Sequence, residues 1–162
     1  MAKSSYESLS DSSRIWIYRS DRLLSAEETL KIDNWLNQFT EKWTAHNQSL
    51  KAFGQVYHSK FIVILLDEES SNQASGCSID SQVRFIKDIG KALNVDFFDR
   101  LHFDFLIDNS IITIHKNKVL SKIEEGILSE ESLVLDHLVK SKMQFEHAWS
   151  VPLSQSWHRR LI

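Results

Sequence analysis

The feature that most constrains the fold of this chain is an unbroken apolar run, Phe61-Ile62-Val63-Ile64-Leu65-Leu66. A short run of this kind, rich in β-branched residues, is typical of a strand. Because the run does not alternate with polar residues, both faces of the strand must be covered, as in the centre of a sheet. A strand over residues 50–56, joined to it through Tyr57-His58-Ser59, predicts an antiparallel pair.

Local patterns also predict a strand and a helix before this pair. Residues 14–19 are β-branched and aromatic, which indicates a first strand. Ser25-Ala26-Glu27-Glu28 is a capping box that opens a helix over about residues 26–44. Apolar residues recur in it at helical spacing, so Trp35 and Trp43 are expected to lie in the core.

A second helix and two further strands follow the apolar run. The helix is expected to have Ser78 as its N-cap residue and to run to about Leu93. Residues 101–106 alternate between apolar and polar and predict a strand, which Asp108-Asn109 turns into another over 111–114. The order strand-helix-strand-strand-helix-strand is that of a ferredoxin-like antiparallel sheet with two helices on one face. We therefore expect an α+β fold.

The remaining residues predict a small extension on this core. A short helix near residues 117–125 is expected to stop at Gly126, and two tryptophans near the end indicate that the C-terminus packs on the domain. A strand over 133–135 and a helix over 139–149 complete the extension. The predicted organisation is a disordered serine-rich tail over 1–13, an α+β core over 14–116, and a C-terminal α/β extension over 117–162.

Composition excludes several classes of function. The 162 residues carry a net charge of -3, which offers no electrostatic footprint for nucleic acid. The apolar run is far too short to span a membrane, and the first 13 residues lack the apolar segment of a secretory signal. The single cysteine cannot form an internal disulfide. These features predict a cytoplasmic protein.

Several motifs resemble those of one family. They are Trp16-Ile17-Tyr18-x-Ser20-x-Arg22, Trp43-x-x-His46, Ser75-Gly76-Cys77-Ser78-Ile79-Asp80, Leu138-Val139-x-x-Lys142, Trp149-x-Val151-Pro152 and Ser156-Trp157-His158. Over almost the whole chain after residue 13, the sequence resembles short bacterial proteins of uncharacterised function, often labelled "ABC transporter ATPase". The label finds no support here, because no P-loop motif G-x-x-x-x-G-K-[ST] occurs among the four glycines. The resemblance implies a stand-alone protein and gives no reaction.

The segment Ser75–Asp80 is the best local candidate for a site. Cys77 lies at the start of the second helix, where unpaired amides favour an anion or a thiolate. Gly76 would allow close approach and Ser78 would add a hydroxyl, whereas Asp80 disfavours a highly charged phosphate. A structural, buried cysteine is the alternative interpretation.

A catalytic Cys77 would need a base. His46 is the preferred candidate, because it follows the first helix in one of the family motifs, and His58 and His102 are the alternatives. Asp80 is a further candidate catalytic residue. These residues would form a small cysteine-dependent hydrolase or thiol-transfer enzyme.

Two other constellations are interpreted as structural. Acidic residues at 67–69, with Asp104 and Asp108, show no metal-ligand spacing, so neither a metal nor another cofactor is expected. Trp157-His158-Arg159-Arg160 could stack on and pair with a nucleic acid, but one basic segment on an acidic protein does not predict such a partner.

Together, these observations predict a non-catalytic module that binds a small ligand or a protein partner. Its site would lie where Cys77 meets His46 and the tail residues Trp157 and His158. The cysteine enzyme is the first alternative. A structural homodimer, formed through an exposed sheet edge or the aromatic tail, is the second.

Overall fold

The apolar run forms β5 (Phe61–Leu66), the middle strand of a three-stranded antiparallel sheet with the order β1-β5-β4. The structure, a computed structural model, describes residues 4–162. The flanking strands are β1 (Arg14–Arg19) and β4 (Ala52–Tyr57), and every side chain of β5 is completely buried. The predicted central strand is therefore confirmed.

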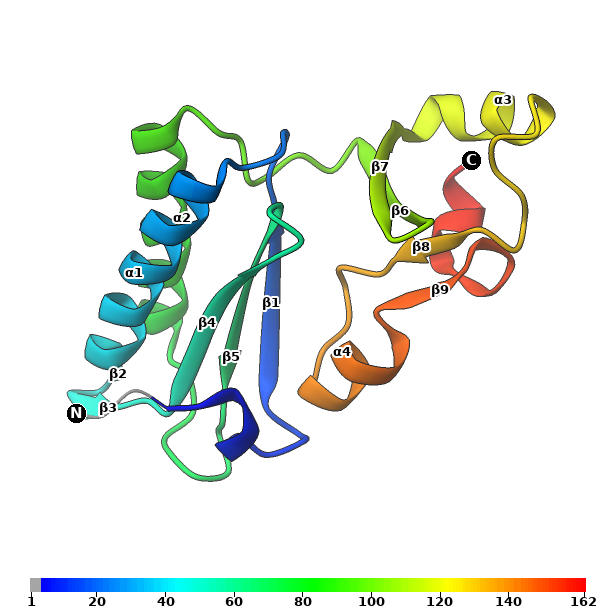
Figure 1. Cartoon of the computed structure of the whole chain (residues 1–162). Coiled ribbons are helices and arrows are strands. Elements are labelled where there is room, and N and C mark those ends of the chain that lie inside the picture. The colour runs from blue at the N-terminus through cyan, green and yellow to red at the C-terminus, as the bar shows by residue number, and fades with distance from the viewer. Residues whose placement is uncertain (1–3) are drawn as a thin grey trace.

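Two long helices cover one face of this sheet, α1 (Ala26–Lys42) and α2 (Gly76–Leu93) (Figure 1). They share a core cluster with the side chains of Ile62, Ile64 and Leu66. Both predicted helices are confirmed, and α1 begins with the predicted capping box. Within residues 4–162, no helix combines the length and the apolar character needed to cross a membrane.

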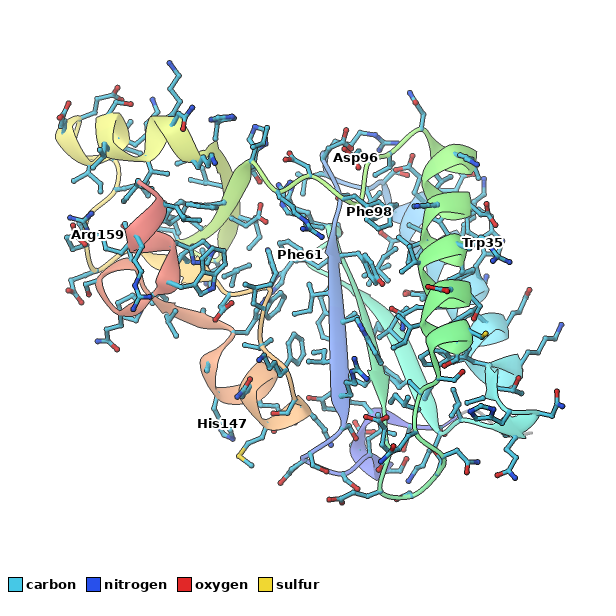
Figure 2. The ribbon with its side chains drawn as sticks, turned by 180° about the vertical axis from the view of Figure 1, so that it is seen from behind. Trp35, Phe61, Asp96, Phe98, His147 and Arg159 are labelled. Carbon is cyan, nitrogen blue, oxygen red and sulfur yellow. The ribbon has the colours of Figure 1, made fainter. Side chains whose placement is uncertain are left out.

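The opposite face of the sheet is covered by residues from the C-terminal third of the chain. Phe61, Val63 and Leu65 pack there in one cluster with Val139 and Phe145. Phe145 belongs to α4 (Lys142–Ala148). Figure 2 shows Phe61 on the side of the sheet that faces the C-terminal part, away from Trp35 on the helical layer.

A second antiparallel sheet has the order β7-β6-β8-β9. Its strands are β6 (His102–Ile107), β7 (Ser110–His115), β8 (Leu133–Leu135) and β9 (Ser150–Pro152). The ferredoxin-like arrangement is not confirmed, because β6, expected as the fourth strand of the first sheet, pairs with β7 and β8 instead. The part of the chain that is described is thus α+β, with four α-helices and three antiparallel sheets.

The small elements occupy the ends and corners of these layers. The third sheet is the hairpin of β2 (Thr44–Ala45) and β3 (Gln48–Ser49). The predicted helix near 117–125 is α3 (Val119–Glu124), and Gly126 follows it with a φ of 76°, as expected of a helix-ending glycine. Short 3-10 helices lie over Tyr6–Ser8, Lys116–Lys118, Leu153–Gln155 and Trp157–Leu161.

The predicted segment boundaries differ from the observed packing. Strands β6 and β7 precede residue 116 but share a sheet with β8 and β9, so the sheets divide near residues 98–101 rather than at 116/117. Within the expected tail over residues 1–13, Leu9 is only 4% exposed, and Ser10 donates from its amide and its hydroxyl to Asp67 at 3.0 Å. Residues 1–3 lie outside the described part.

A buried carboxylate holds the two larger sheets together. Asp104 of β6 is completely buried and accepts two hydrogen bonds from Arg19 of β1, at 2.7 and 3.1 Å. Thr113 donates to it at 2.6 Å, and His137 Nε2 lies 2.9 Å from it. Burial would raise the pKa of Asp104, but hydrogen bonds and charges from His137 and Arg19 hold it well below its usual range.

We expect Asp104→Asn to lower the free energy of unfolding by roughly 3 to 5 kcal/mol at neutral pH, because Arg19 would lose a buried counter-charge. The deficit should shrink as the pH falls below about 4, since a carboxyl whose folded pKa is depressed stabilises only while it is ionised. Urea denaturation across pH would measure both effects. Asp108→Asn, at an exposed turn position, is the matched control and should change stability by less than about 0.5 kcal/mol. Equal stability of both variants would contradict this role of Asp104.

Candidate functional site

The start of α2 is fixed by a reciprocal pair of serines. Ser75 is the N-cap residue, and its hydroxyl accepts from the Ser78 amide at 3.1 Å, while the Ser78 hydroxyl accepts from the Ser75 amide at 2.7 Å. The prediction of Ser78 as N-cap is therefore wrong: Ser78 is the third helical residue of a capping box. Its carbonyl accepts from the Trp43 indole at 2.9 Å, which ties the end of α1 to the start of α2.

A hollow of about 690 Å³ lies beside this helix start. We call it the Cys77 hollow; its lining residues are Thr44, His46, Asn47, Ser75, Gly76, Cys77, Ser78 and Ser81. His46 enters it from the tight turn between β2 and β3, where its φ is 51°. Four of the site residues predicted from the sequence therefore lie together in the structure: His46, Gly76, Cys77 and Ser78.

The Cys77 hollow contains few polar groups that are free to bind or activate a ligand. Cys77 is exposed, and in the described chain no hydrogen bond links its sulfur to His46. The Ser78 side chain is buried, and its hydroxyl also donates to the Ser75 carbonyl at 2.8 Å. The Ser78 hydroxyl therefore has no proton left to donate to an anion, because its one O–H bonds within the cap. A Cβ at Gly76 would meet nothing within 4 Å, so packing does not require glycine there.

The remaining predicted site residues lie elsewhere. Asp80 is exposed on α2 and does not line the hollow. Trp157 and His158 belong to the C-terminal 3-10 helix, at the far side of the molecule from α2 (Figures 1 and 2). The expected site that joins Cys77 and His46 to the tail does not form in this structure.

Trp157 and His158 make contacts that hold the C-terminus against the rest of the protein. The Trp157 indole donates to Asp136 at 2.8 Å, and the His158 ring stacks on Trp157 with a centroid distance of 3.8 Å. His158 is 3% exposed and lies edge-on to Phe103 of β6. Burial lowers the pKa of His158 to about 4. This pair therefore anchors the C-terminus, as the sequence analysis expected of the aromatic tail.

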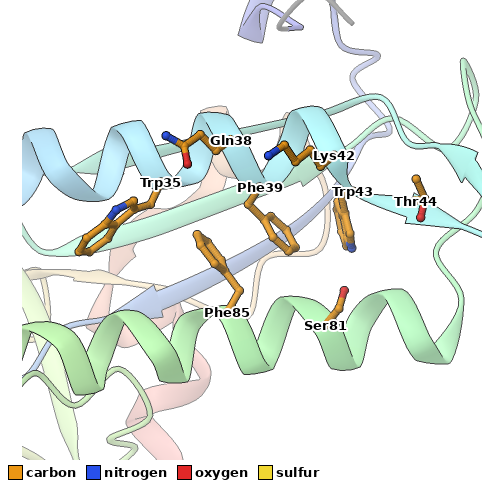
Figure 3. A pocket seen from close by; sticks show the side chains of 8 residues that line it. All are labelled: Trp35, Gln38, Phe39, Lys42, Trp43, Thr44, Ser81 and Phe85. Atoms are coloured by element: carbon orange, nitrogen blue, oxygen red, sulfur yellow. The ribbon is translucent and has the colours of Figure 1, made fainter.

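A second concavity of about 400 Å³ runs between α1 and α2 (Figure 3). We call it the aromatic groove; its lining residues are Trp35, Gln38, Phe39, Lys42, Trp43, Thr44, Ser81 and Phe85. Phe39 of α1 stacks on Phe85 of α2, with a centroid distance of 4.4 Å and an angle of 8° between the rings. The two helices thus present aromatic surface to the outside of the molecule.

The groove and the hollow adjoin, because Thr44 and Ser81 line both. Neither set of lining residues contains a carboxylate, although the chain carries a net charge of -3. Lys42 is the one lysine or arginine among them, and within residues 4–162 it takes part in no ion pair. The combined surface is therefore apolar at one end, polar at the other, and free of negative side chains.

Sequence analysis missed the groove because it assigned its aromatics to the core. Trp43 is indeed buried, but Trp35 and Phe39 are only partly so. The signal was present in the spacing, since residues 35, 38, 39 and 42 follow one flank of α1. Which flank meets a neighbouring helix, and which stays open, depends on where α2 packs.

Other clusters of titratable residues do not form a site of this kind. The oxygens of Asp104 are occupied by Arg19, Thr113 and His137. Lys60 is buried nearby, and its desolvation lowers its pKa. In the described residues, no group of three or more histidine, cysteine or acidic side chains is arranged to hold a metal ion.

Comparison with other proteins adds no identification: no protein-family model matches the chain, and neither a curated protein nor a solved structure matches it. The family resemblance drawn from the motifs therefore stays a prediction. The case for a function depends on the geometry of the aromatic groove and the Cys77 hollow.

We expect Cys77 to react with iodoacetamide in the native protein at a rate within about threefold of that in the unfolded chain. The thiol is exposed, but in the described structure no hydrogen bond activates it. Mass spectrometry of a time course would measure both rates. A native rate more than about tenfold higher would contradict this expectation and favour the cysteine-enzyme alternative. Complete protection would contradict the exposure itself.

We expect His158 to stay neutral in the folded protein until the pH approaches 4. Since the unfolded chain takes up this proton near pH 6.5, stability should fall by about 1 to 3 kcal/mol between pH 6.5 and 4. His158→Gln should show a shallower fall over that range in urea denaturation. The exposed His147 provides the control, because His147→Gln should leave the slope unchanged. An NMR titration of His158 with a midpoint near 6.5 would refute the prediction.

Proposed function

We propose that this protein is a cytoplasmic, non-catalytic module that binds a protein segment carrying an aromatic side chain next to acidic residues. The binding surface would be the aromatic groove continued into the Cys77 hollow. The observation that carries this proposal is their continuity at Thr44 and Ser81, together with the absence of carboxylates from their linings.

The aromatic end of the surface would supply most of the affinity. Trp35, Phe39 and Phe85 lie partly exposed on rigid helices, so an aromatic side chain could bury further apolar area against them. Aromatic pairs of this kind contribute about 0.5 to 1.5 kcal/mol beyond the burial of area. Because the rings are already held by packing, little conformational entropy would be lost on binding.

The polar end would select the charge of the partner. Lys42 lies in the last turn of α1, and the first amides of α2 border the adjoining hollow. A positive side chain and a helix N-terminus both favour negative groups. On a protein with a net charge of -3, this carboxylate-free surface is the part that least repels an acidic segment.

The cysteine-enzyme alternative keeps one supporting observation, since Cys77 and His46 line the same hollow. It requires His46 to reach the thiol when a substrate binds, because the described structure shows no hydrogen bond between them. Substitution separates the two functions: Cys77→Ser would abolish an enzymatic activity and would leave binding of a peptide almost unchanged.

The proposal can be tested by NMR titration with a synthetic peptide of alternating phenylalanine and glutamate. The five tryptophan indole signals report on different places. We expect the signals of Trp35 and Trp43 to shift and those of Trp149 and Trp157 to stay, because only the first two line the groove. A matched peptide with lysine in place of glutamate should bind at least about tenfold more weakly.

Charge reversal on the protein gives the complementary test. Lys42→Glu should weaken binding of the acidic peptide about fivefold to tenfold, because it places a negative charge in the lining. Lys140→Glu, which changes an exposed lysine of the C-terminal part, is the matched control and should have no effect. If neither peptide shifts Trp35 and Trp43, or if both bind equally, the proposal is wrong.

A further inference from the structure

Strand β7 (Ser110–His115) has one sheet edge without a partner. It is the end strand of the second sheet and, among residues 4–162, pairs only with β6. Between Ser110 and His115 it contains no acidic residue, no lysine, no arginine and no proline, and Ile112 is 38% exposed. Natural proteins usually protect such edges, because unpaired backbone groups recruit another strand.

The other outer strands of the two larger sheets carry protection that β7 lacks. Strand β9 has three residues and ends at Pro152. On β4, the carboxylate of Asp33 accepts from the Val56 amide at 2.9 Å. On β1, the backbone of Arg14 already pairs with that of Ser141 in an isolated antiparallel β-bridge. Among the outer strands of the two larger sheets, β7 is therefore the one suited to pairing.

The hairpin turn fixes which residues of β7 point outward. Asp108 and Asn109 both have positive φ, as in a two-residue type I′ turn, and Ile107 faces Ser110 across it. In such a hairpin the closing pair exchanges hydrogen bonds, so every second residue from Ser110 onward bonds to β6. The amides and carbonyls of the alternate residues point away from the sheet; these residues are Ile111, Thr113 and His115.

We propose that β7 pairs antiparallel with β7 of a second copy of this chain, with the two-fold axis at Thr113. Outward residues must face outward residues for their backbone groups to bond. The register centred on Thr113 pairs Thr113 with its own copy, and Ile111 with His115 of the second copy. It is the register that employs all three outward residues, and it joins the two sheets into one continuous sheet.

Side chains and charges favour a second copy as the occupant. In this register Ile112 lies opposite Ile114, so apolar residues pair on one face. Asp108 precedes β7, and Lys116 and Lys118 follow it, so antiparallel pairing brings the acidic end of each strand toward the basic end of the other. Because the axis is two-fold, this favourable pairing occurs twice. The association does not involve the aromatic groove, which lies on the opposite layer, so it is independent of the proposed function.

Amide hydrogen exchange on the unmodified protein tests the register directly. At low protein concentration, we expect the amides of Ile111, Thr113 and His115 to exchange fast and those of Ser110, Ile112 and Ile114 to exchange slowly. At high concentration the first three should become at least about tenfold slower, while the others keep their rates. Protection of all six at the lowest concentration would show that the edge is covered, and unchanged exchange of the first three would show that it stays unpaired. Either result would overturn the proposal.

A matched pair of variants tests the interface by sedimentation velocity. Ile112→Lys places a charge beside the paired edge of each copy and should raise the dimer dissociation constant at least about tenfold. Leu120→Lys introduces the same charge at an exposed apolar residue of α3 and should not change it. Circular dichroism would confirm that both variants fold. Equal association of the two variants, or a monomer at every concentration of the unmodified protein, would refute self-pairing of β7.

Discussion

The architecture depends on one buried carboxylate, Asp104. It belongs to β6 of the second sheet, and the positive charge of Arg19 on β1 of the first sheet neutralises it. Arg19 reaches it from β1 across the gap between the sheets. The Trp149 indole donates to His137 Nδ1 at 3.2 Å, so the other ring nitrogen, Nε2, is the one that donates to Asp104. None of these groups could stay buried alone. Docking of the second sheet is therefore a condition for burying either charge, and this couples the two parts of the molecule.

The apolar character of β5 gives the physical reason why the second part is needed. Ile62, Ile64 and Leu66 are covered by α1 and α2, but Phe61, Val63 and Leu65 would face water if the chain ended after β7. Residues 135–149 supply the missing cover. The same fact argues against a ferredoxin-like sheet, which has helices on one face and leaves the other open. A strand without alternation was thus a signal in the sequence against the topology that the order of elements suggested.

Local patterns predicted the elements well because short-range physics determines them. The capping box of α1, the turns at His58-Ser59 and Asp108-Asn109, and Gly126 after α3 all act within a few residues. Sheet membership was not predictable in this way. The alternating strand over 101–106 predicts one polar face, yet its polar residue Asp104 is buried against Arg19, 85 residues earlier in the chain. Local alternation shows that one face is polar and cannot show what covers it.

The candidate site was predicted in part for a similar reason. The motifs placed His46 and Cys77 in one hollow, because both lie at ends of α1 and α2 that the indole of Trp43 ties together. The aromatic groove was missed because periodicity identifies an apolar face without its width. Trp43 lies at the centre of that face, whereas Trp35 and Phe39 lie at its border and stay partly exposed. Rings at the border of a core are rigid because the core holds them, and they still have area left to bury. This combination is the reason for proposing the aromatic groove between α1 and α2, rather than the cysteine alone, as the recognition surface.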